Sequence, residues 1–89
     1  MSNKRQLKKQ INLVCNELFV DFVAATLYGK DPTEEKAEAI LRSLAHLQKN
    51  YTSRICHPEP GMPAKKYFKD LRINFSKDTH EILDHIINL

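Results

Sequence analysis

Residues that interrupt helices occur in only two short segments of this chain. Both glycines and all four prolines lie in residues 28–32 and 57–63. Because glycine and proline are the strongest helix breakers, the three long stretches around these segments are free to form continuous helices. A helix of about 25 residues would measure roughly 37 Å, at a rise of about 1.5 Å per residue. The sequence therefore predicts three long helices over residues 3–28, 32–56 and 63–88.

Apolar residues within each stretch recur at the three- and four-residue spacing of an amphipathic helix. The predicted core faces are Leu7, Ile11, Val14, Leu18, Phe22 and Ala25; then Ala37, Ile40, Leu41, Leu44, Leu47, Tyr51 and Ile55; then Ala64, Phe68, Leu71, Phe75, Thr79, Ile82, Ile86 and Leu89. Three such helices joined by short connections pack most simply as an antiparallel up-down-up bundle. We therefore expect an all-α fold in which residues 1–89 form a single helical domain.

The boundary between the first two helices carries the clearest local signals. Gly29 suits the left-handed conformation that often ends a helix. Asp31 is placed to cap the next helix, with Pro32 at the first helical position and Glu34 completing a capping box. We therefore expect the second helix to begin at Pro32.

The composition is that of a folded protein, since 42% of the residues are apolar and 28% are charged. The longest apolar run, residues 18–28, is interrupted by Asp21 and is shorter than a membrane span. The basic N-terminal residues are not followed by the apolar stretch of a signal peptide. We expect a cytoplasmic protein with no membrane contact, in which Cys15 fills the core and Cys56 remains a reduced thiol near a connection.

No combination of residues predicts catalysis, a cofactor or a bound metal ion. The chain lacks a nucleophile elbow and a glycine-rich phosphate loop. His80 with Asp84, and Glu81 with His85, share helix faces, but each pair offers only two metal ligands. A helix-turn-helix motif is also disfavoured, because it needs a short recognition helix after a tight turn. We therefore expect a protein that is not an enzyme.

Charge is unevenly distributed along the predicted bundle, although the net charge is only +3. Acidic residues collect at one end, and basic residues collect at the other. The basic end has three interpretations: it could bind nucleic-acid phosphates, it could meet the acidic end of a second copy or of another protein, or it could be a solvated surface without a partner. Aromatic residues that could stack on bases are scarce there, which favours protein association. The candidate phosphate contacts are Lys4, Arg5, Lys8, Lys9, Lys65, Lys66 and Lys69.

A second apolar stripe lies outside the predicted core. Leu13, Val20 and Leu27 recur every seven residues, on the side of the first helix away from its core face. The third helix has a matching stripe that includes His80, and we expect the two stripes to merge into one elongated patch. An exposed apolar patch of this kind usually marks an interface. The predicted interface residues are Leu13, Phe19, Val20, Val23, Leu27, Ile73, His80, Leu83 and Ile87.

The sequence therefore predicts a small non-enzymatic helical protein that acts through protein association, as a twofold homodimer with an adaptor or regulatory role. Its partner is not identified by any motif. His80 at the interface would make association depend on pH near about 6.5, where histidine ordinarily titrates. The alternative function is nucleic-acid binding by the basic end.

Overall fold

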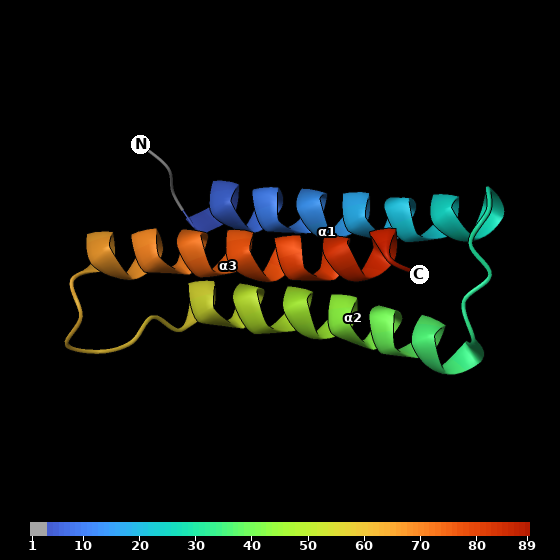
Figure 1. The fold of residues 1–89 in the computed structure, drawn as a ribbon. Helices are drawn as coiled ribbons and strands as arrows, with labels where there is room; N and C mark the ends of the chain where they lie inside the picture. The colour runs from blue at the N-terminus through green and yellow to red at the C-terminus, as the bar shows by residue number, and fades with distance from the viewer. Residues whose placement is uncertain (1–3) are drawn as a thin grey trace.

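The computed structural model describes residues 4–89 and is built from three helices. α1 spans Lys4–Leu27, α2 spans Glu34–Cys56 and α3 spans Ala64–Ile87. Figure 1 shows the helices lying along one long axis, with α2 running in the opposite direction to α1 and α3. The molecule measures 46 × 22 × 16 Å. The predicted all-α helical bundle is confirmed. Residue 3, the predicted start of the first helix, lies outside the described residues.

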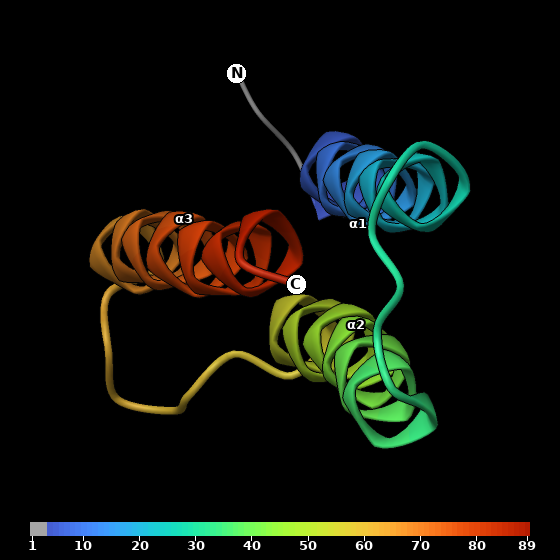
Figure 2. The ribbon, with the colours of Figure 1, turned by 45° about the vertical axis from the view of Figure 1, so that its right-hand side comes forward.

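The core lies where the three helices meet, and Figure 2 shows them at the corners of a triangle. Each helix turns one stripe inward, so most residues of the predicted core faces are buried or half-buried. Leu41 and Ala64 are exceptions, since both are exposed. α3 contributes less than the other helices, with only Leu71 and Ile86 fully buried. The fully buried set is Leu7, Ile11, Cys15, Leu18, Phe22, Ile40, Leu44, Leu47, Tyr51, Ile55, Leu71 and Ile86.

The end of α1 depends on a glycine, as predicted. Gly29 has a φ of 147°, a backbone conformation that residues with a Cβ atom rarely adopt. The Lys30 backbone N–H then donates a hydrogen bond of 2.8 Å to the Ala25 carbonyl oxygen. This bond spans six residues, as in the Schellman motif that satisfies free carbonyls at a helix end. The chain can therefore leave α1 sharply and turn towards α2.

The start of α2 differs from the prediction. α2 begins at Glu34, and its N-cap is Thr33, whose hydroxyl accepts a 3.2 Å hydrogen bond from the Lys36 backbone N–H. The predicted cap at Asp31 and the helix start at Pro32 are therefore wrong. The local signals favour Asp31, because aspartate is the stronger cap and is followed by Pro32 and Glu34, so cap preference does not explain the use of Thr33.

This assignment predicts a selective effect on stability. Thr33→Ala should lower the free energy of unfolding by about 1 kcal/mol, because it leaves an amide of the first turn of α2 without its acceptor. Asp31→Ala is the matched control and should leave stability nearly unchanged. Urea unfolding followed by circular dichroism measures both. A larger loss of stability for Asp31→Ala than for Thr33→Ala would show that Asp31, and not Thr33, caps α2.

Candidate interaction surface

α1 carries a stripe of apolar side chains on the side that faces away from the core. The exposed fractions are 56% for Leu13, 61% for Val20 and 71% for Leu27. Leu13 lies two residues from both Ile11 and Cys15, which are buried. Two residues correspond to a rotation of about 200°, so Leu13 must point away from the core. We call Leu13, Val20 and Leu27 the outer stripe of α1.

Two other apolar residues flank the outer stripe of α1. Phe19 is 48% exposed, and Val23 is half-buried. Both lie next in sequence to residues of the core or of the stripe, so they occupy the side of α1 between the two. The apolar surface of α1 is therefore wider than one line of residues.

The predicted stripe on α3 lies on a different corner of the bundle. Ile73 and Ile87 are more than half exposed, His80 is exposed, and Leu83 is half-buried. Ile73 lies two residues from Phe75, which packs against the core, so Ile73 points outward. Figure 2 shows α1 and α3 at different corners of the triangle.

The structure therefore does not bring the two stripes together into the single patch expected from the sequence. The groove between α1 and α3 is lined by Leu13 but not by Ile73; its other lining residues include Glu17, Arg72 and Phe75. Polar side chains from both helices thus stand between the stripes. His80, the predicted pH-sensitive position, lies on the α3 stripe and away from the outer stripe of α1.

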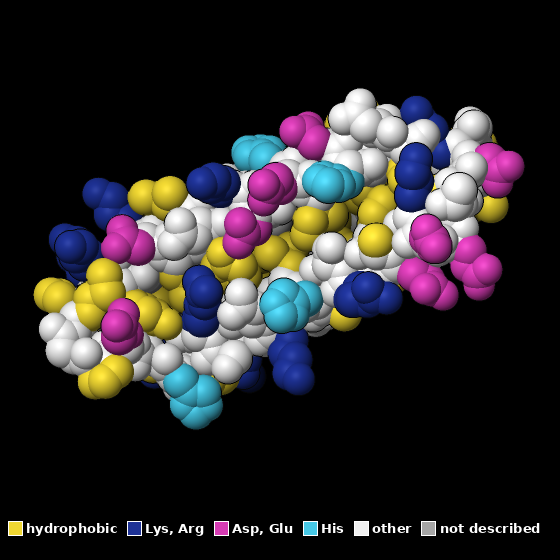
Figure 3. All heavy atoms as spheres, turned by 60° about the horizontal axis from the view of Figure 1, so that its bottom comes forward, with side chains coloured by type: hydrophobic (Ala, Val, Ile, Leu, Met, Phe, Trp, Pro, Cys, Tyr) yellow, Lys and Arg dark blue, Asp and Glu magenta, His cyan; other side chains and the backbone are white. Residues whose placement is uncertain are grey.

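Charged residues are separated along the long axis. The basic candidates lie in the first turns of α1 and α3, and Figure 1 shows that these two helix starts are at the same end. All seven of these residues are exposed: Lys4, Arg5, Lys8, Lys9, Lys65, Lys66 and Lys69. Asp31, Glu34, Glu35 and Glu38 are exposed around the α1–α2 connection at the other end. Figure 3 shows acidic side chains gathered at that right-hand end.

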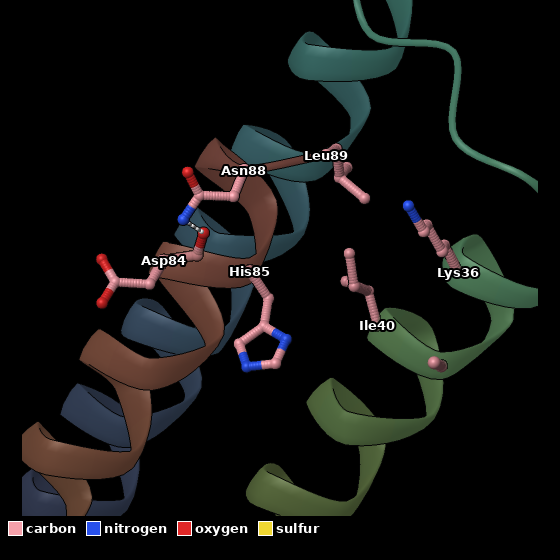
Figure 4. Close-up of a pocket in the computed structure, with 7 residues that line it drawn as sticks. Lys36, Ile40, Asp84, His85, Asn88 and Leu89 are labelled. Carbon is pink, nitrogen blue, oxygen red and sulfur yellow. Dashed lines mark hydrogen bonds between the residues drawn. The ribbon is translucent and has the colours of Figure 1, made fainter.

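A shallow groove with an apolar floor runs between α2 and α3 (Figure 3). One part of it has a volume of about 380 Å³ and is lined by Lys36, Ile40, Asp84 and His85, among others. Figure 4 shows the His85 ring directed towards α2, whereas the Asp84 carboxylate points away from it. The two side chains thus do not form a histidine–carboxylate pair for acid–base catalysis.

Metal-binding residues are also dispersed in the described part of the chain. Within residues 4–89, no group of three or more histidine, cysteine, aspartate or glutamate side chains is placed to hold a metal ion. His80 and Glu81, with Asp84 and His85, are all exposed. Cys15 is buried and Cys56 is exposed, and both thiols are free. Burial raises the pKa of the Cys15 thiol, which therefore stays protonated and unreactive.

Tyr51 forms a polar link between α2 and α3 that the sequence did not reveal. Its side chain is 1% exposed, and its hydroxyl donates a 2.5 Å hydrogen bond to Oδ2 of Asp78. The Phe75 ring packs edge-on against it at 5.1 Å, and the Arg54 guanidinium lies 5.1 Å from the ring centre. Two causes raise the pKa of Tyr51 to about 12: the larger is burial of the hydroxyl, and the smaller is the nearby Asp78 carboxylate. This cluster holds two helices together.

No protein-family model, curated protein sequence or solved structure matches this chain.

Among the described residues, α1 is long and apolar enough to cross a membrane by length and composition alone, with a mean hydropathy of 1.2 in its most apolar window. The core helix of a soluble bundle has the same property. Only 22% of that apolar window is buried in the bundle. The exposed apolar residues of α1 therefore define the candidate interaction surface.

Proposed function

We propose that this protein acts through protein association, as a homodimer that buries the outer stripe of α1. The observation that supports this proposal is the exposure of Leu13, Val20 and Leu27 along one helix face, with Phe19 beside them. Burying such a side chain completely contributes about 1.5 to 3 kcal/mol. In a twofold interface each residue contributes once from each copy, so a short stripe yields a substantial driving force.

A binding role accounts for more of the surface than a catalytic one. The Tyr51–Asp78 hydrogen bond joins α2 and α3, and its tyrosine is buried in the core, so this pair has a structural role. The apolar stripe, by contrast, recurs over two heptads and lies on a regular helix. A rigid helical face of this kind suits an adaptor or regulatory protein that works by docking.

Sedimentation equilibrium at micromolar concentration tests the proposal. We expect the native chain to sediment as a dimer and Val20→Glu to sediment as a monomer, because the interface would bury the new carboxylate. Ala45→Glu is the matched control, since it places the same carboxylate on an exposed position of α2, and it should remain dimeric. Circular dichroism verifies that both variants stay helical. A native chain that is monomeric at these concentrations overturns the proposal.

The second candidate function is nucleic-acid binding, and it is supported by the exposed lysines at the start of α1 and α3. Such a cluster binds phosphates without reading bases, and its affinity falls steeply with salt. Sedimentation of the native chain with mixed DNA and RNA at low salt distinguishes this function. Absence of co-sedimentation would reject it and would leave the dimer proposal unaffected.

A further inference from the structure

We infer that the second copy docks antiparallel on α1, with the twofold axis at Val20 and with Leu13 of each copy against Leu27 of the other. This inference rests on the proposed homodimer and specifies its geometry. It is carried by two independent properties of the surface: the spacing of the outer stripe of α1 and the opposite charges at its two ends.

The outer stripe of α1 is symmetric about its middle residue. Leu13 and Leu27 each lie seven residues from Val20, which is roughly 10.5 Å along the helix. A twofold rotation through Val20 that reverses the helix direction therefore superimposes the stripe on itself. Self-complementarity of this kind is what a twofold interface requires. All three side chains are more than half exposed, so all three gain from being covered.

Charges on either side of the stripe select the antiparallel direction. Lys9 lies eleven residues before Val20, and Asp31 lies eleven residues after it. In the antiparallel arrangement the basic start of α1 faces the end of the second copy that carries Asp31 and the acidic first turns of α2. A parallel arrangement would place like charges opposite each other at both ends, which disfavours it. The residues concerned are Lys4, Arg5, Lys8 and Lys9 at one end and Asp31, Glu34, Glu35 and Glu38 at the other.

The segment between Leu13 and Leu27 is compatible with close contact. Glu17 and Asp21 are its only charged residues. Glu17 also lines the groove shared with α3, which places it at the edge of the stripe. Asp21 precedes the buried Phe22 and follows Val20, so it also lies to one side. Glu17 and Asp21 also line a surface depression with Leu13 and Val20, so the interface needs both carboxylates to stay in contact with water at its rim.

The same charge pattern favours a second copy over a lipid bilayer. An apolar helix face with basic residues suits an anionic membrane surface. Here, however, the acidic first turns of α2, with Glu34, Glu35 and Glu38, lie at the same end of the bundle as Leu27 and would be repelled by anionic headgroups. A second copy in the antiparallel orientation, by contrast, places its acidic end against the basic end of the first copy and its basic end against the acidic end.

Disulfide cross-linking tests the geometry in a Cys56→Ser background, which removes the exposed native thiol. Air oxidation of Val20→Cys should give a covalent dimer, because residues at the axis approach within the roughly 7 Å between Cα atoms that a disulfide requires. Leu13→Cys alone and Leu27→Cys alone should not cross-link, since copies of the same residue would lie roughly 21 Å apart along the helices. A mixture of these two variants should form only the mixed dimer.

The outcomes separate the geometry from the homodimer proposal itself. A Cys56→Ser chain that sediments as a dimer while Val20→Cys stays uncross-linked overturns the antiparallel register and leaves the homodimer proposal standing. Efficient cross-linking of Leu13→Cys alone would indicate a parallel pair and would also overturn the register. A chain that sediments as a monomer overturns both proposals, and flotation of that monomer with anionic vesicles would assign the stripe to a lipid surface.

Discussion

Replacing Ile55 by alanine is expected to lower the free energy of unfolding by about 2 to 5 kcal/mol. Ile55 is 0% exposed, so the substitution removes apolar contacts and leaves a cavity in the core. Proteins typically have roughly 0.05 to 0.15 kcal/mol of stability per residue, and the loss is therefore a large share of the total for a chain of this length. Urea denaturation followed by circular dichroism gives the change directly.

Ile73→Ala provides the matched control, because it makes the same substitution on the outward side of α3. Ile73 is 57% exposed, and the expected change is within about 0.5 kcal/mol. The comparison keeps the chemistry constant and varies only burial. Equal effects at the two positions would contradict the arrangement of α2 and α3 described above.

Tyr51→Phe is expected to lower the free energy of unfolding by about 1.5 to 3 kcal/mol, as for other hydrogen bonds to a charged group. The substitution keeps the ring packed against Phe75 and removes only the donor to Asp78. Tyr28→Phe is the matched control, since Tyr28 is 86% exposed and should show no comparable loss. Similar effects for the two substitutions would argue against the Tyr51–Asp78 hydrogen bond.

The Tyr51–Asp78 pair also predicts a pH dependence at alkaline pH. Folding raises the pKa of Tyr51 from 10.0 to about 12, because burial and the Asp78 carboxylate both disfavour the phenolate. The folded state therefore holds its proton more tightly than the unfolded state. The stability contributed by the protonated side chain is complete below about pH 10 and is lost as the pH rises towards about 12. Absorbance titration of tyrosinate should show a step near pH 12 that is missing in Tyr51→Phe.

Much of the fold follows from local features of the sequence. The glycines and prolines mark where α1 and α2 end and where α3 begins, because these residues limit the backbone whatever surrounds them. The three- and four-residue spacing identifies the core faces, and Ile11, Tyr51 and Ile55 are indeed the most deeply buried large side chains. The seven-residue spacing of Leu13, Val20 and Leu27 likewise places them together on one side of α1.

Other features required the tertiary structure. The local signals favour Asp31 as the cap of α2, whereas the structure uses Thr33. Leu41 belongs to the apolar face of α2 by spacing. It is nevertheless 40% exposed, whereas its neighbour Ile40 is buried in the core. Asp78 meets Tyr51 only because α2 and α3 are aligned at that height.

The same distinction explains the interaction surface. The sequence by itself determined which residues share a side of each helix, because the rotation per residue is a local property of the backbone. It did not determine how each helix is rotated against its neighbours, which depends on the packing of side chains from all three. That rotation leaves Leu13 and Ile73 both more than half exposed on helices that occupy different corners of the bundle (Figure 2), and so the symmetric stripe of α1 is a separate surface.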